Sequence, residues 1–174
     1  MNNSFIFLKR HFFPISLILI LAFARLIPHP PNFTPIIAVA ILSGYFFKNI
    51  YLSFATLLIS MLISDLYIGF YGNFIFVYCS LLLIAFLFYK ISNSVNFKNL
   101  FIYSFVGSLI FFIVSNFGVW ALGGLGVNDI PYEKNLSGLI QCYVLAIPFF
   151  GSTFISTLIF AYPAIFIYKL LPAW

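Results

Sequence analysis

Residues that could carry out catalysis or bind a metal are few in this sequence, and they form no recognisable motif. The 174 residues include two His and three Asp or Glu, and the two cysteines, Cys79 and Cys142, lack metal-ligand spacing. No HExxH or GxSxG motif and no phosphate-binding glycine loop is present. We therefore expect no enzyme activity, no cofactor and no metal site, and any use of ATP would need another subunit.

Two charged residues, Arg25 and Asp65, lie inside apolar stretches. Counted at 1.5 Å per residue, each lies about 20 Å from the end of its stretch that we assign below to the cytoplasmic side. An unpaired charge inside a bilayer is costly, so the matching depths predict an ion pair. The pair could clamp two helices together or face a ligand, and the sequence leaves both roles open.

Other hydrogen-bonding and aromatic residues come at a similar depth or just outside it. Asn116 and Trp120, for example, are one helical turn apart and share a face. We expect these residues to line one cavity that opens toward the outer face, with an interfacial aromatic belt as the alternative for Trp120. The predicted solute-binding residues are Arg25, His29, Asn32, Asp65, Asn116, Trp120, Gln141 and Tyr143.

The composition places these residues in a membrane. Apolar residues make up 64% of the chain and charged residues 6%, whereas about a quarter of the residues of a soluble domain are charged. The net charge of +5 comes from scattered cations, which do not form the basic patch of a nucleic-acid-binding protein. The sequence therefore predicts a single integral membrane domain over residues 1–174, surrounded by the lipid bilayer and binding no nucleic acid.

Six apolar stretches are the predicted membrane spans. If the N-terminus is cytoplasmic, six Lys or Arg lie on the inner side and two on the outer side, as the positive-inside rule requires. This pattern predicts an all-α, multi-pass protein of the cell membrane with both termini inside; a cleaved signal peptide is the alternative for the first stretch. The spans are expected at about 12–26, 35–47, 50–70, 74–89, 99–122 and 149–170.

The second stretch, 35–47, is too short to cross a bilayer. As a helix it would rise about 20 Å, against a hydrocarbon core of about 30 Å. The preceding segment, 28–34, is therefore expected to dip into the membrane from outside. Thr34 as N-cap and Pro35 at the first helical position would start the helix.

The last apolar run, 139–170, is too long for one span, because it would extend about 48 Å. Pro148 and Gly151 predict a break, with an outer interfacial helix over about 139–147 before the true span. Shortened and broken helices that open to the same face commonly build the ligand cavity of membrane carriers. A packed outer lid is the alternative.

Four strings of the sequence carry a resemblance to a known family. They resemble an uncharacterised family of small six-helix bacterial membrane proteins. That family in turn resembles the substrate-binding S-components of energy-coupling-factor vitamin transporters, through its six helices, its irregular outer first loop, and an Asp followed by Gly that ends the third span. The strings are RLIPHPPNFTP at 25–35, SDLYIG at 64–69, SNFGVW at 115–120 and GLIQCYVLAIPFF at 138–150.

The resemblance implies an S-component-like bundle in a bacterial inner membrane, with a vitamin-sized ligand under the outer loops. It also implies a partner assembly of one coupling membrane protein and two ATPase subunits. The small residues Ala40 and Gly44 are the positions that could dock to this partner. They lie in the second stretch, whereas the docking motif of S-components usually lies in the first, where Ala22 is the alternative position. Packing within the chain is the alternative for both.

The predicted function is that of a membrane-embedded substrate-binding subunit of a small-solute uptake transporter, energised by partner subunits. The alternatives are a stand-alone small channel or carrier and a non-catalytic membrane scaffold or assembly subunit. A scaffold would lack a ligand cavity, and a stand-alone carrier would move its solute without ATPase partners.

Overall fold

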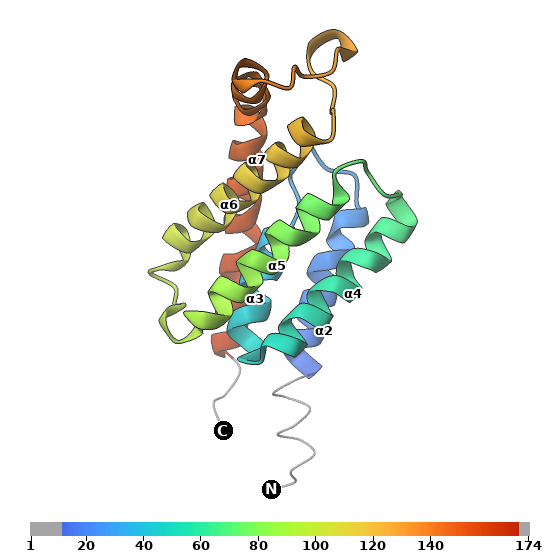
Figure 1. Cartoon of the computed structure of the whole chain (residues 1–174). Helices are drawn as coiled ribbons and strands as arrows, with labels where there is room; N and C mark the ends of the chain where they lie inside the picture. Colours follow the sequence, from blue (N-terminus) through green and yellow to red (C-terminus); the bar gives the residue numbers. More distant parts are fainter. Residues whose placement is uncertain (1–11, 171–174) are drawn as a thin grey trace, which may run out of the picture.

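The computed structural model describes residues 12–170, and this part of the chain is all-α (Figure 1). Within it, the one β-type contact is an isolated bridge between Leu125 and Pro131, so these residues form no sheet. The prediction of an all-helical protein is confirmed. The helices are α2 (Phe13–Phe23), α3 (Ile36–Phe47), α4 (Ile50–Ile68), α5 (Phe74–Lys90), α6 (Leu100–Ala121) and α7 (Leu136–Leu170), with short 3-10 turns η2 (Ala24–Leu26), η3 (Ser92–Ser94) and η4 (Val127–Asp129).

Three of the helices in residues 12–170, namely α4, α6 and α7, are long and apolar enough to cross a membrane. The other three are apolar but shorter. The six predicted segments therefore all exist as helices, and half of them reach spanning length. Their length and composition are compatible with a membrane protein.

Helix α3 is the centre of the bundle. Eleven of its twelve residues are buried, and it packs against α2, α4, α5, α6 and α7. A helix that is apolar on all sides has to be covered on all sides, which explains the central position. At twelve residues it is about 18 Å long, so it fills only part of the depth that its neighbours enclose.

The start of α3 differs from the prediction by one residue. Pro35 is the N-cap: its carbonyl accepts the first helical hydrogen bond from Val39 at 2.9 Å, and Thr34 makes no capping bond. The Thr34 carbonyl is instead bound by the Ser156 hydroxyl of α7 at 3.0 Å. The segment before α3 is thus attached to α7, and this attachment fixes where the short helix begins.

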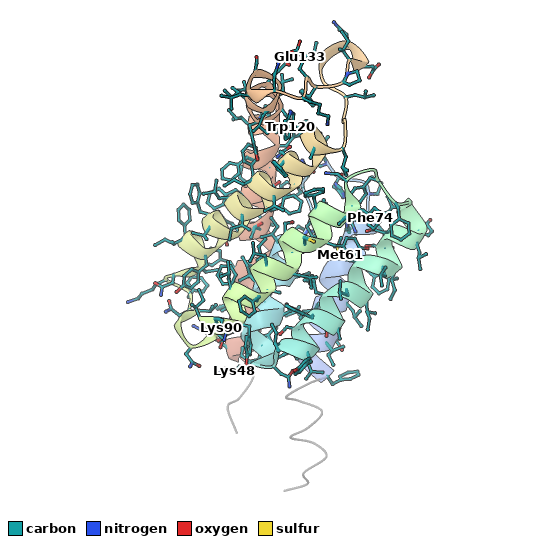
Figure 2. All side chains as sticks on the ribbon, viewed as in Figure 1. Lys48, Met61, Phe74, Lys90, Trp120 and Glu133 are labelled. Atoms are coloured by element: carbon teal, nitrogen blue, oxygen red, sulfur yellow. The ribbon has the colours of Figure 1, made fainter. Side chains whose placement is uncertain are left out.

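The connection between α3 and α4 carries Lys48 and lies at the same end of the bundle as Lys90 (Figure 2). Lys48, with a positive φ of 48°, ends α3, and the side chain of Asn49 caps α4 by accepting the N–H groups of Tyr51 and Leu52. Figure 2 shows Lys48 and Lys90 at this end, and Trp120 and Glu133 at the opposite end. The grouping agrees with the charge distribution from which the orientation in the membrane was predicted.

The orientation can be tested by cysteine labelling in intact cells. In a chain whose two cysteines are replaced by alanine, Val127→Cys at the Trp120 end should react with a membrane-impermeant thiol reagent, because positively charged ends stay in the cytoplasm. Asn93→Cys at the Lys48 end should not react until the membrane is permeabilised. Both positions are exposed, so labelling of Asn93→Cys in sealed cells would reverse the assigned orientation.

Helix α7 contradicts the predicted break. It is one helix of 35 residues, about 52 Å long, with Pro148 and Pro163 inside it. The separate interfacial helix at 139–147 was therefore wrong. Figure 1 shows that the excess length projects: the first turns of α7 and the loop before it stand above the ends of α2, α4 and α5.

Packing on α6 explains why α7 continues through Pro148. Before the proline, the Tyr143 hydroxyl donates to the Ile113 carbonyl of α6 at 2.8 Å. After it, the Phe150 ring packs edge-on against Phe112 of α6 with centroids 5.6 Å apart. A proline removes one backbone hydrogen bond, whereas ending the helix would leave several groups without partners, which is costly in apolar surroundings.

Candidate functional site

A cavity of about 570 Å³ opens at the end of the bundle opposite Lys48 and Lys90. Its floor is the beginning of α3, represented by Thr34 and Ile36, and its walls come from the longer neighbouring helices. The cavity therefore exists because the central helix is short. The polar lining residues are Arg25, His29, Asn32, Thr34, Tyr71, Asn73, Ser115, Asn116 and Thr153, and the aromatic ones include Phe111, Phe112, Phe149 and Phe150.

One wall holds a buried ion pair between Arg25 and Asp65. The η2 turn carries Arg25 to α4, where its Nη1 lies 2.7 Å from Asp65 Oδ1 and donates to Ser64 Oγ at 2.7 Å. The Asp65 side chain is fully buried, and its Oδ2 accepts a hydrogen bond from Tyr78 at 2.8 Å. The predicted pair is confirmed.

The end of α4 explains why Asp65 needs these partners. Gly69, with a φ of +99°, ends the helix, and its N–H bonds the Asp65 carbonyl at 2.8 Å. Asp65 is thus in the last turn, where the negative end of the helix dipole disfavours a carboxylate. Arg25 and Tyr78 offset that cost.

Tyr71 stands next to the ion pair, in the connection between α4 and α5. Burial raises the pKa of its hydroxyl to about 12; Asp65 also raises this pKa, and the charge of Arg25 and a hydrogen bond from Arg25 act in the opposite direction. The hydroxyl is therefore protonated at neutral pH. It presents a neutral group to the cavity.

Hydroxyl groups of α7 hold the segment before α3 against the cavity. Thr153 Oγ1 lies 3.5 Å from the Asn32 carbonyl and donates to the Phe149 carbonyl at 2.9 Å. Together with the bond from Ser156 to Thr34, these contacts join parts of the chain that are about 120 residues apart. Asn32 itself has a positive φ of 60°, which an Asn tolerates better than most residues.

Two asparagines line the opposite rim, where α5 begins and α6 ends. Asn73 Nδ2 donates to the Ser115 carbonyl at 3.2 Å, and Asn116 Nδ2 donates to the Phe112 carbonyl at 2.8 Å. These bonds fix the orientation of both amides, because only the nitrogen can donate to a carbonyl.

The structure brings together half of the predicted binding residues. Arg25, His29, Asn32 and Asn116 line the cavity. Asp65 lies behind Arg25 and does not line it, because its carboxylate is completely covered.

The other three predicted residues lie outside the cavity. Trp120 turns to the outer loop, where its Nε1 donates to the Glu133 carbonyl at 2.8 Å. Tyr143 bonds the backbone of α6, and Gln141 is exposed on α7. The prediction that these three share the cavity with Asn116 was wrong, because none of them is among the residues that line it.

Several lining residues were missed from the sequence. Tyr71 carried a signal, since it continues the helical spacing of the polar residues Ser60 and Ser64, although it lies just beyond the end of α4. Asn73 follows it at the same outer turn and could have been chosen on that ground. For Thr153 the sequence offers no signal, because the assumed break near Pro148 hid the face that it shares with the cavity.

The predicted docking residues Ala40 and Gly44 are buried inside the bundle, each within the described core around α3. A Cβ built on Gly44 would come within 2.6 Å of the Tyr89 backbone nitrogen and 2.8 Å of the Ala85 carbonyl oxygen. The small residues therefore allow α3 and α5 to pack closely. They are covered by this chain's own helices and are not open to a partner.

Replacing Gly44 by alanine should destabilise the fold by about 1 to 3 kcal/mol, because the atoms in the way are backbone and cannot rotate aside. Denaturant unfolding in detergent micelles would measure the change. Gly72→Ala is the matched control, since nothing lies within 4 Å of a Cβ at that position. A Gly44→Ala protein as stable as the control would mean that α3 and α5 are farther apart than described.

These features of the described residues define an all-helical protein with three helices long and apolar enough to cross a membrane, a cavity above a short central helix and a buried ion pair in the cavity wall. The chain belongs to a family of unknown function (DUF6580), whose model matches residues 6–173. No curated protein and no solved structure matches the chain. Among residues 12–170, no group of three or more His, Cys, Asp or Glu could hold a metal ion.

Proposed function

We propose that this chain is the substrate-binding subunit of a small-solute uptake transporter in the cell membrane. The resemblance described above suggests that this membrane is the bacterial inner membrane. The observation that carries the proposal is the cavity of about 570 Å³. That volume suits a vitamin-sized molecule, and ligand sites of a few hundred Å³ are commonly lined by aromatic residues with a few polar groups. With the lysine-rich end in the cytoplasm, the cavity opens to the outside.

The floor of the cavity supports a binding subunit over an open channel. Below Ile36, the side chains of Ile37, Ile41 and Leu57 are completely or almost completely buried. A pore would need a continuous polar passage, and these apolar side chains occupy the centre of the described bundle below the cavity. Movement of a solute inward then requires a rearrangement of helices.

Partner subunits would supply the energy for that rearrangement. The chain has no ATP-binding motif, and the resemblance to S-components suggests one coupling membrane protein and two ATPase subunits. Because Ala40 and Gly44 are buried, the docking surface in this proposal is formed by other, lipid-facing residues.

The proposal is tested by identifying what the protein carries. The chain, purified in mild detergent from cells grown in rich medium, should release one small molecule on denaturation, and mass spectrometry would identify it. Adding that molecule back should raise the melting temperature of the emptied protein. A scaffold would release no stoichiometric compound, whereas uptake by proteoliposomes that contain this chain alone would favour the stand-alone carrier.

A further inference from the structure

We propose that the cavity selects neutral solutes that carry hydrogen-bond donors, such as amides, imides and lactams, and discriminates against carboxylates and phosphates. This inference rests on the proposed function, because it names the chemical class of the solute. It follows from the charge of the cavity and from the direction of the hydrogen bonds in its wall.

The charge at the cavity is balanced. Among the described residues that line it, Arg25 is the one Lys, Arg, Asp or Glu. Its Nη1 is already 2.7 Å from Asp65 Oδ1 and from Ser64 Oγ. An anionic solute would face a guanidinium whose charge Asp65 already offsets, and it would lose its hydration without gaining an unpaired cation.

The wall of the cavity is rich in hydrogen-bond acceptors, because five of its side chains already donate a hydrogen bond to a backbone carbonyl of the protein itself. A hydroxyl has one hydrogen. Ser115 and Thr153 therefore meet a solute as acceptors, each Asn offers its carbonyl oxygen and a second N–H, and the Tyr71 hydroxyl can donate or accept. The bonds run from Asn73 Nδ2 to Ser115 O (3.2 Å), Ser115 Oγ to Phe111 O (2.6 Å), Asn116 Nδ2 to Phe112 O (2.8 Å), Thr153 Oγ1 to Phe149 O (2.9 Å) and His29 Nδ1 to Pro30 O (2.9 Å).

The floor has the opposite polarity. Helix α3 begins there with no side-chain cap at Pro35, so its first N–H groups and the positive end of its dipole are at the base of the cavity. A carbonyl oxygen fits this end, and N–H or O–H groups fit the acceptor wall. A neutral amide carries both groups on adjacent atoms, whereas a carboxylate carries acceptors alone.

Matched pairs of vitamin-sized probes test the inference on the full chain in lipid nanodiscs. Each pair compares a neutral compound with the corresponding carboxylate: nicotinamide with nicotinate, biotinamide with biotin, and panthenol with pantothenate. In the pairs that bind, the neutral member should bind at least about 10-fold more tightly, which corresponds to one charged or polar group left uncompensated. N,N-dimethylnicotinamide, which lacks the amide hydrogens, should bind about 10-fold more weakly than nicotinamide.

Two variants attribute the selectivity to the wall. Asn116→Leu removes an acceptor and should weaken the neutral probe about 10-fold while leaving the carboxylate unchanged. Gln141→Leu makes the same kind of change at an exposed position outside the cavity and should have no effect.

Each result decides a different point. Equal or tighter binding of the carboxylates, or equal effects of Asn116→Leu and Gln141→Leu, would overturn the inference and leave the proposed function in place. An anionic compound released by the purified protein would do the same. If no probe binds and no compound is released, the proposed function fails, and the inference fails with it.

Discussion

Loss of either member of the Arg25–Asp65 pair is expected to destabilise the fold by about 3 to 5 kcal/mol, which is the usual cost of leaving one buried charge without its partner. The side chains are 9% and 0% exposed, so water cannot replace the missing group. Arg25→Gln and Asp65→Asn are the informative variants, because each keeps the shape and removes the charge. The free energy of unfolding in mixed micelles is the measurement.

A double-mutant cycle separates the pair from its surroundings. The combined variant should lose much less stability than the sum of the two single variants, because it leaves no unpaired charge. Tyr78→Phe is the control: it removes the hydrogen bond to Asp65 and leaves the ion pair, and should cost about 1 kcal/mol. Additive losses from Arg25→Gln and Asp65→Asn would mean that the two charges do not interact.

The same pair shows what a sequence can predict for a bundle of apolar helices. Depth along a helix follows from counting residues, because the rise per residue is constant. Arg25 and Asp65 matched in depth, and a buried charge demands a partner, so the contact could be predicted. The short helix α3 was predictable for the same reason, since its length depends only on where the apolar run begins and ends.

The direction in which a side chain points could not be predicted in this way. On a soluble helix, the apolar face identifies the side that packs, but α6 and α7 are apolar nearly all round. Asn116 and Trp120 share a face of α6 by spacing, yet Asn116 lines the cavity and Trp120 bonds the outer loop at Glu133. The loop decides between them, and its path is not encoded in the periodicity of the helix.

The predicted break in α7 failed for an energetic reason. The run 139–170 was predicted to break because about 48 Å exceeds the thickness of a bilayer and Pro148 interrupts the backbone hydrogen bonds. In apolar surroundings the backbone groups freed by ending the helix would have no partner, and the continuous contact with α6 favours an unbroken helix. The predicted positions of Gln141 and Tyr143 over the cavity depended on that break. The break and these two placements are therefore wrong for the same reason.

Occlusion of the cavity is expected to have the largest effect on solute binding. Asn116→Trp puts an indole into a cavity of about 570 Å³ and removes an amide whose observed bond is to Phe112 of its own helix. The backbone of α6 does not need that bond, so the fold should lose no more than about 1 kcal/mol. Binding of the compound that co-purifies with the wild-type chain should weaken at least about 100-fold, or about 2.7 kcal/mol.

Trp120→Ala is the matched comparison, because it changes a large side chain one turn away that does not line the cavity. The indole Nε1 of Trp120 donates to the Glu133 carbonyl, and the ring centroid lies 5.5 Å from the Lys134 ammonium. Loss of the ring should therefore loosen the outer loop and lower the melting temperature, while the affinity for the solute stays within about threefold of wild type. Isothermal titration and thermal unfolding of both variants would separate the two roles. If Trp120→Ala abolishes binding and Asn116→Trp does not, the solute is held under the outer loop and not above α3, because only a site at the loop would depend on Trp120.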